Sequence, residues 1–505
     1  MEILRPCYWQ IMRDWLAIRA RATPASTAVV DAASGRSTSY GDLDDEVEHL
    51  AGQLSAFGVG VDDHLGVLAE TRPGFVRLVH AANRLGAVLV PLNVRLTARE
   101  LDGTLDAADV DTLICTAETE PTATEAFDGP LATVDQPSEG ARPLSTIDPE
   151  SFELGSWTRD CTAALLATSG TTGGPKLVEL TMGNLAASAA ASSWRLGVLP
   201  DDRWYCTLPM YHMGGLAPVY RSVLYGTSVA VSTGSFDPEG SLAEMDRVGA
   251  TATSLVPTMC RELLEADGEA VMASLRFVLV GGAPTPDSLV ETAREADVSL
   301  YPSYGMTETS SQIATASPTQ TREALGTVGS PLMFTRVTTV DSDDVPVEPG
   351  ASGEIVVSGP TVTPGYYDDA EATEDAFGPH GFHTGDAGYR DESGKLWVLN
   401  RLTDRIITGG ENVDPGEVVD VLRDYPDVED AFVAGVPDDR FGQRVAALLV
   451  GPDSAEPVEQ FARDRLAGFK IPRQWRLVDA LPRTASGTVD RAAATLLLEE
   501  PDTAR

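Results

Sequence analysis

The chain has 505 residues, of which 43% are hydrophobic and 22% are charged, a balance typical of a globular protein. Its 76 acidic residues against 37 basic ones give a net charge of −39, which excludes nucleic acid and anionic membranes as partners because both would repel it. No apolar run is long enough to span a bilayer, and charges throughout residues 1–20 exclude a signal peptide. We therefore expect a soluble, cytoplasmic protein.

The cysteines exclude two further classes of protein. The five cysteines are odd in number, scattered and without a CxxC pair, which argues against a disulfide framework or a zinc site.

The basic residues are unusual as well, since only Lys176, Lys395 and Lys470 are lysine. Acidic excess along the whole chain, with arginine in place of lysine, suggests a halophilic host whose salt screens the self-repulsion.

The first 115 residues alternate between helical and strand patterns. A helix is predicted to begin at Tyr40, and a second one to span 73–85, between strands at 64–70 and 87–92. This alternation favours an α/β fold with mostly parallel sheets. Residues 117–155 are acidic, rich in Pro, Thr and Ser and weakly periodic, so we expect a surface connection there.

The segment that follows is built like a phosphate-binding loop. An apolar run leads into Thr168 to Gly174, a run of glycines and hydroxyl residues, and Lys176 follows. Glycines let backbone N–H groups approach an anion, while hydroxyls add donors and the lysine adds charge. A flexible linker is the bland alternative. A Walker A loop would need Ser or Thr after Gly-Lys, whereas Pro175 precedes Lys176 and Leu177 follows it.

Further glycine and hydroxyl segments follow predicted strands. The strands at 251–256, 276–280 and 299–301 precede such segments, of which Gly281-Gly282 and Ser303 to Glu308 are examples. Ligands of α/β sheets gather at the carboxyl ends of strands, so we expect a binding site there.

The pattern changes after residue 335 to short antiparallel strands at 353–358 and 395–400. The last hundred residues read as a compact α+β unit with helices from 415 and 457 and strands at 428–435, 445–450 and 474–478. We predict a large N-terminal domain over 1–400 that includes a small β subdomain, a small mobile C-terminal domain over 401–497, and a disordered tail over 498–505.

Five motifs occur in an order that identifies a family. They are 168–176, Tyr304 to Thr309, Phe382 to Asp386, Arg401 with Gly409 to Asn412, and Leu481 to Gly487. They resemble the adenylate-forming superfamily of acyl-CoA synthetases, luciferases and peptide-synthetase adenylation domains, over nearly the whole chain. Within it, 211–226 and 305–312 look most like the o-succinylbenzoate:CoA ligases of menaquinone biosynthesis.

The resemblance implies a substrate carboxylate that attacks the α-phosphate of Mg·ATP and an acyl-adenylate that then reacts with the CoA thiol. Positioning and electrostatic stabilisation should dominate such chemistry. Lys176, Thr307 and Glu308 would be catalytic, and Glu308 would also bind Mg²⁺. The nucleotide would contact Thr168, Ser169, Gly170, Thr171, Thr172, Gly173, Lys176, Tyr304, Gly305, Thr307, Asp386 and Arg401. Taken alone, Asp386 also fits a turn and Glu308 a helix N-terminus.

The acyl group would contact His212, Arg221, Gly281, Gly282, Ser303 and Ser311. Arg221 is more informative than His212, because an arginine inside an apolar segment must be paired or face a cavity. In the o-succinylbenzoate ligases an arginine at this spacing from the histidine is thought to grip the aromatic carboxylate. A salt bridge to an acidic residue is the alternative for Arg221, and a packed core residue is the alternative for His212.

One position departs from the family. The lysine expected after Gly487 is replaced by Thr488, and loss of its charge could slow adenylation. Three accounts remain open: an impaired ligase, compensation by Lys470 or Arg491, or a changed conformation of the small domain. Lys470 could equally be a structural residue.

Other functions stay open at this stage. The substrate could be another aromatic or medium-chain acid. Because Thr488 replaces the usual lysine, the chain could also be a catalytically silent protein that binds acyl-adenylate. An amino-acid adenylation domain is disfavoured, because no Asp lies near His212 and no carrier domain follows. The expected small molecules are ATP, Mg²⁺, CoA and a carboxylic acid, and a homodimer is left open.

Overall fold

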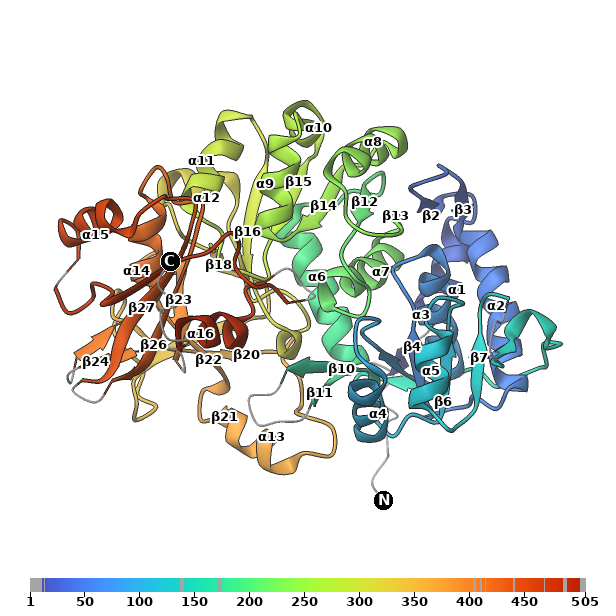
Figure 1. The fold of residues 1–505 in the computed structure, drawn as a ribbon. Helices are drawn as coiled ribbons and strands as arrows, with labels where there is room; N and C mark the ends of the chain where they lie inside the picture. Colours follow the sequence, from blue (N-terminus) through green and yellow to red (C-terminus); the bar gives the residue numbers. More distant parts are fainter. Residues whose placement is uncertain are drawn as a thin grey trace, which may run out of the picture. The chain divides into compact units, whose positions relative to one another are not determined.

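The structure is a computed structural model that describes residues 11–12, 14–136, 140–169, 175–402, 406–408, 411–413, 415–438, 441–466, 468–484 and 488–499. Its chain forms two compact units (Figure 1). Unit 1 comprises Met1–Leu325, Gly329–Arg336 and Val357–Gly378, and unit 2 comprises Gly326–Val328, Val337–Val356 and Pro379–Arg505. This division does not follow the boundary at residue 401, which remains a prediction.

Unit 1 contains a seven-stranded sheet in the order β11-β10-β5-β4-β6-β7-β8. All neighbouring strands in it are parallel except β10 and β11, which form an antiparallel hairpin. The strands are β4 (His64–Leu68), β5 (Val88–Pro91), β6 (Thr112–Cys115), β7 (Leu131–Thr133), β8 (Arg142–Pro143), β10 (Thr162–Ser169) and β11 (Pro175–Thr181).

A nine-stranded sheet in the same unit has the order β18-β17-β16-β15-β14-β12-β13-β2-β3. Its six middle strands are parallel, and antiparallel strands close both edges. The strands are β2 (Thr27–Asp31), β3 (Ser37–Ser39), β12 (Arg203–Cys206), β13 (Ser228–Val231), β14 (Ala252–Leu255), β15 (Phe277–Val280), β16 (Leu300–Tyr304), β17 (Ala314–Thr315) and β18 (Ser330–Pro331).

Helices flank these sheets (Figure 1). The helix predicted from Tyr40 is α2, which the Ser39 side chain caps and which buries Leu43, Val47 and Leu54. The helices of unit 1 are α1 (Trp15–Ala22), α2 (Tyr40–Ala56), α3 (Pro73–Leu85), α4 (Ala98–Ala107), α5 (Glu120–Ala126), α6 (Met182–Leu196), α7 (Met213–Tyr225), α8 (Pro238–Val248), α9 (Pro257–Glu265), α10 (Glu269–Ser274), α11 (Asp287–Glu295), α12 (Pro318–Glu323) and α13 (Ala370–Ala376). The α/β fold with mostly parallel sheets is therefore confirmed.

The surface connection predicted over 117–155 is wrong. That segment contributes α5, β7 and β8, and a small pairing of β1 (Ile11–Met12) with β9 (Trp157–Thr158) follows it. Ala132 of β7 is fully buried, as is the Glu120 side chain, which accepts hydrogen bonds from the backbone N–H groups of residues 140 and 141. The segment thus completes the edge of the seven-stranded sheet.

Unit 2 contains two sheets. In the first, β20 lies between β19 and β22, and β23 pairs with β22; in the second the order is β25-β24-β27-β26, with β28 parallel to β27. The elements are β19 (Arg336–Val340), β20 (Gly353–Ser358), β22 (Gly381–Arg390), β23 (Leu396–Arg401), β24 (Ile406–Thr408), β25 (Glu411–Val413), α14 (Pro415–Arg423), β26 (Asp430–Asp438), β27 (Gly442–Val450), α15 (Ala455–Arg463), β28 (Gln474–Leu477) and α16 (Arg491–Glu499).

The predicted tail begins too early. Helix α16 runs to Glu499 and buries Leu498 completely, so the first two residues of the tail are helical, and the other six lie outside the described residues. None of the helices in the described part of the chain combines the length and apolar character needed to cross a membrane.

Candidate functional site

The predicted phosphate loop joins two paired strands. In the β10–β11 hairpin Thr168 pairs with Lys176 and Ser169 with Pro175, and the Thr168 hydroxyl donates to the Lys176 carbonyl oxygen at 3.3 Å. Gly170, Thr171, Thr172 and Gly173 lie outside the described residues. Strand pairing on both sides therefore fixes the two ends of the loop.

The lysine of this loop and the predicted magnesium ligand contact the same aromatic side chain. The Lys176 ammonium lies 5.0 Å from the centroid of the Tyr366 ring, and the Tyr366 hydroxyl donates to Glu308 Oε1 at 3.2 Å. Lys176 and Glu308 are thus brought together, as the motifs predicted, through a tyrosine that the sequence did not single out.

The turn that carries Thr307 and Glu308 has a strained backbone. After the single 3₁₀ turn η2 (Thr307–Thr309), Ser310 and Ser311 have φ angles of 55° and 119°. Residues other than glycine rarely adopt such positive φ angles. At Gly305 an added Cβ would lie 1.7 Å from the Ser311 carbonyl oxygen. The turn therefore requires glycine at 305 and is held in one conformation, as a preorganised ligand site often is.

Glu308 suits a magnesium ion that arrives with ATP. The part of the chain described here contains no group of three or more His, Cys, Asp or Glu side chains that could hold a metal. Mg²⁺ in ATP sites is typically bound by one or two carboxylates together with substrate phosphates and water. The buried carboxylate of Glu308, 8% exposed, fits that pattern.

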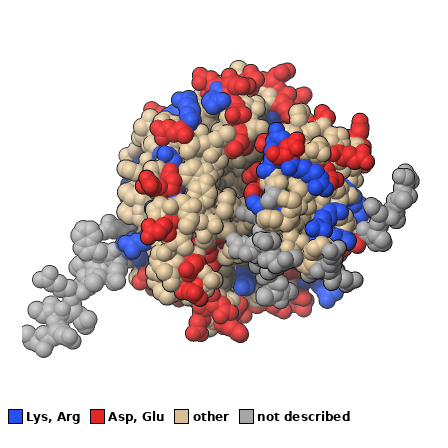
Figure 2. Space-filling view, turned by 90° about the vertical axis from the view of Figure 1, so that its left-hand side faces the viewer, with Lys and Arg blue, Asp and Glu red and all other residues tan. Residues whose placement is uncertain are grey.

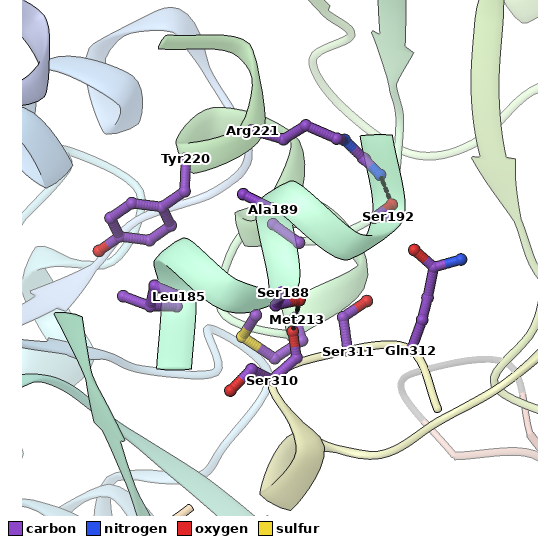
Figure 3. Close-up of a pocket in the computed structure, with 11 residues that line it drawn as sticks. Leu185, Ser188, Ala189, Ser192, Met213, Tyr220, Arg221, Ser310, Ser311 and Gln312 are labelled. Atoms are coloured by element: carbon purple, nitrogen blue, oxygen red, sulfur yellow. Dashed lines mark hydrogen bonds between the residues drawn. The ribbon is translucent and has the colours of Figure 1, made fainter. Parts of the chain in front are cut away.

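A pocket next to this turn has apolar and polar side chains in its walls and one buried cation. Helices α6 and α7 and the 310–312 segment enclose about 270 Å³ of empty space, counted with the part that opens to solvent (Figure 3). The lining residues are Leu185, Ser188, Ala189, Ser192, Met213, Ala217, Tyr220, Arg221, Ser310, Ser311 and Gln312. Of the predicted acyl-site residues, Arg221 and Ser311 line this pocket.

Arg221 is buried among neutral groups. Its Nη1 donates to the Ser192 hydroxyl at 2.6 Å (Figure 3), and its guanidinium lies 3.9 Å from the Trp204 ring centroid. Burial lowers the pKa of Arg221 to about 10, so it remains charged at neutral pH. Within the described ranges no carboxylate pairs with it, and the salt-bridge alternative is therefore not seen.

His212 and the strand-end residues lie outside this pocket lining. His212 occupies the N-cap position of α7 without a capping hydrogen bond from its side chain. Burial lowers the pKa of its imidazole and the Arg95 charge lowers it further, so the ring is neutral at neutral pH. The Ser303 hydroxyl lies 3.4 Å from the Gln312 amide nitrogen, and a Cβ on Gly281 would approach the Ser303 carbonyl oxygen to 3.0 Å. Gly281 and Ser303 are therefore linked to the pocket through Gln312.

Gly282 follows directly on Gly281 at the end of β15. Its φ of +80° is one that glycine adopts freely, so the backbone conformation accounts for glycine there.

The predicted ribose residues form a pair in unit 2. Arg401 Nε lies 2.8 Å from Asp386 Oδ1, and their strands pair at these two positions. Asp386 is buried, and its backbone N–H is held by the Thr384 hydroxyl at 3.1 Å. The carboxylate thus has a fixed position and a cationic neighbour.

The residues around the missing lysine are engaged elsewhere in unit 2. Thr488 shares a 2.7 Å hydrogen bond between hydroxyls with Thr484, and Lys470 forms an ion pair with Glu417 at 2.5 Å. The guanidinium of Arg491 lies 5.4 Å from the Phe432 ring centroid. Compensation by Lys470 would require it to leave Glu417.

Sequence reasoning missed several residues of the site. Ser188 and Ser192 share one face of α6 because they are four residues apart, a spacing that is visible in the sequence but common in Ala/Ser-rich helices. Trp204 and Tyr366 gave no local signal, since only the packing of distant segments brings them to Arg221 and Lys176.

Two family models match the chain. One, described as AMP-binding enzyme, covers residues 16–367, and the other, described as AMP-binding enzyme C-terminal domain, covers residues 417–488. The boundary predicted at 401 falls between these two segments.

The similar proteins extend over almost the whole chain. The 2-succinylbenzoate–CoA ligase of Bacillus thuringiensis subsp. konkukian is 37% identical, with 97% of this chain and 99% of the relative covered. The solved structure of o-succinylbenzoate CoA synthetase from Bacillus subtilis with the acyl-adenylate intermediate OSB-AMP has a TM-score of 0.88 at 34% identity and covers 97% and 99% of the two chains. ATP-bound MatB from Rhodopseudomonas palustris has a TM-score of 0.87 at 30% identity, with the same coverage.

Because Arg221 is buried without a carboxylate partner, we predict that its charge lowers the stability of the folded protein. Arg221→Met should raise the free energy of unfolding by about 1 kcal/mol in denaturant titrations, because it removes the desolvation of an uncompensated cation. Arg195→Met is the matched control: Arg195 Nη2 donates to two carbonyl oxygens, those of Ser330 and Pro331, and its loss should destabilise by about 2 kcal/mol. Destabilisation by Arg221→Met of similar size would contradict the interpretation.

Proposed function

Because this chain belongs to the family of AMP-binding enzymes, we propose that it is an ATP-dependent ligase that joins 2-succinylbenzoate to coenzyme A. The acid's carboxylate attacks the α-phosphorus of ATP and pyrophosphate leaves. The CoA thiol then attacks the acyl-adenylate and AMP leaves, which gives 2-succinylbenzoyl-CoA for menaquinone biosynthesis. The enzyme is thus an AMP-forming acid–thiol ligase that uses ATP, Mg²⁺ and CoA.

The choice of acid is carried by Arg221. A guanidinium buried among serines, a glutamine and apolar side chains is costly unless an anion joins it. 2-Succinylbenzoate has two carboxylates, so one can pair with Arg221 while the other reacts. The polar atoms of Ser192, Ser311 and Gln312 face the same space (Figure 3) and would bind the remaining oxygens. The relatives named for this acid cover nearly the whole chain.

We propose the same nucleotide-binding residues that the sequence motifs predicted. The loop from Thr168 to Lys176 would hold the phosphates, Tyr304, Gly305 and Thr307 would contact the adenylate, and Asp386 with Arg401 would bind the ribose. Mg²⁺, held by Glu308, would neutralise phosphate charge as pyrophosphate leaves. His212, Gly281, Gly282 and Ser303 would border the acyl group, and a neutral His212 can donate a hydrogen bond there without adding charge.

The adenylation step can be tested by ATP–pyrophosphate exchange. Wild type should exchange in the presence of 2-succinylbenzoate in molar KCl, and Lys176→Ala should not, because the phosphates lose a cation. Thr488→Lys separates the accounts of the missing lysine, since exchange by that variant alone would mean that the native first step is impaired. Absence of exchange in all three proteins would contradict the proposal and favour another acid or a silent binder.

The role of Arg221 can be read from a split between two Michaelis constants. Arg221→Met should raise the KM for 2-succinylbenzoate about 100-fold, because truncation of a buried charge partner costs about 2 to 5 kcal/mol, and should leave the KM for ATP nearly unchanged. Arg195→Met, outside the pocket lining, should change neither constant. Equal effects of Arg221→Met on both substrates would exclude Arg221 as the carboxylate partner.

We further propose that the protein works in a salt-rich cytoplasm. Acidic side chains are spread over the face drawn in Figure 2 instead of forming one patch, as expected if salt must screen a net charge of −39. The melting temperature should rise between low and molar KCl, and a flat or falling series would argue against this adaptation. Sedimentation velocity in the same series tests the homodimer.

A further inference from the structure

We infer that Tyr366 is a positioning residue for Mg·ATP that fixes the phosphate lysine and the magnesium carboxylate relative to each other. The inference rests on the proposed function, which makes Lys176 and Glu308 the groups that meet the phosphates and the metal. Tyr366 itself belongs to none of the predicted site residues.

One side chain contacts both charged groups in two different ways. The Lys176 ammonium lies over the aromatic face at 5.0 Å, within the range of a cation–π interaction. The hydroxyl donates to Glu308 Oε1 at 3.2 Å, which restricts the rotation of the carboxylate. The π face thus places the cation without neutralising it, and the hydroxyl orients the anion without a competing positive charge.

The backbone around Tyr366 is fixed to both partners' segments. Residue 366 forms a β-bridge with Val178 of β11, and the Tyr367 N–H donates to the Leu177 carbonyl oxygen at 2.8 Å. On the other side the Thr363 N–H donates to the Glu308 carbonyl oxygen at 2.7 Å. The 363–367 segment therefore connects the strand that carries Lys176 with the turn that carries Glu308.

Gly365 makes this arrangement possible. Its φ is +157°, and an added Cβ would meet the Thr373 side chain at 2.6 Å. The Thr373 hydroxyl in turn accepts a hydrogen bond from the Tyr366 N–H at 2.9 Å. The close approach at Gly365 thus sets the position from which the Tyr366 side chain reaches Lys176 and Glu308.

The chain offers a matched control in the next residue. Tyr367 directs its hydroxyl to Asp109 at 2.9 Å, away from both site residues. Tyr367→Phe therefore removes a tyrosine hydroxyl from the same segment without touching the contacts that the inference concerns.

Calorimetric titration with Mg·ATP and with AMP tests the inference without any acid substrate. Tyr366→Phe should weaken Mg·ATP binding about tenfold, because a hydrogen bond to a charged group is lost, and should raise the Mg²⁺ concentration needed for half-saturation. AMP lacks the outer phosphates and the metal, so its affinity should not change. Tyr366→Leu also removes the ring and should weaken Mg·ATP further, again with AMP binding intact. Tyr367→Phe should match wild type with both ligands.

Each other outcome has a definite reading. Mg·ATP binding by Tyr366→Phe equal to that of Tyr367→Phe would overturn the inference and leave the proposed function standing. Equal losses for AMP and Mg·ATP would show a merely structural role and also overturn it. A wild type that binds AMP but not Mg·ATP would overturn the proposed function, and the inference with it.

Discussion

The proposed acyl pocket is organised around a buried guanidinium that has no carboxylate partner in the described part of the chain. Burial of the Arg221 charge costs folding free energy. The hydrogen bond to Ser192 and the contact with the Trp204 ring offset only part of the hydration free energy that the guanidinium lost. Arg221 lies on α7, Ser192 on α6 and Trp204 on β12, so the packing of these three elements fixes the guanidinium in one place. Under the proposed function a substrate carboxylate would complete the arrangement, and the site would then favour acids with a second negative group.

Because positive charge is scarce in this chain, the few cations near the proposed site are important for binding anionic substrates. ATP, CoA and the acid are all anions, and the protein carries a net charge of −39, so attraction over long distances does not favour binding. Local cations have to compensate. In unit 1 the proposed ones are Lys176 and Arg221, and each lies over an aromatic ring that leaves its charge available. In unit 2 Arg401 stands beside Asp386, at the predicted ribose site.

The sequence predicted elements well where the local pattern agreed with the packing. The α2 helix has a capping serine and an apolar face, and the buried strands of both sheets are short apolar runs before glycine or hydroxyl segments. It failed over 117–155, because β7 has only three residues and α5 is rich in Pro and Thr, so burial at a sheet edge overrode weak local preference.

The site was predictable to a similar extent. Lys176 and Arg221 were found because their residue types are unusual in their local context, and Glu308 was found through the resemblance to the family. Tyr366 and Trp204 were not, since their contacts join residues 190 and 17 positions apart, and no local pattern signals such a contact. The resemblance to a family supplied the roles, and the structure added the side chains that hold the charged groups in place.

The most direct test of the account is to identify the products. The protein should be incubated with 2-succinylbenzoate, Mg·ATP and CoA in molar KCl, and the mixture analysed by mass spectrometry. The account predicts 2-succinylbenzoyl-CoA and AMP in equal amounts, with neither formed when the acid is omitted. AMP and a thioester formed from another aromatic or medium-chain acid, but not from 2-succinylbenzoate, would contradict it.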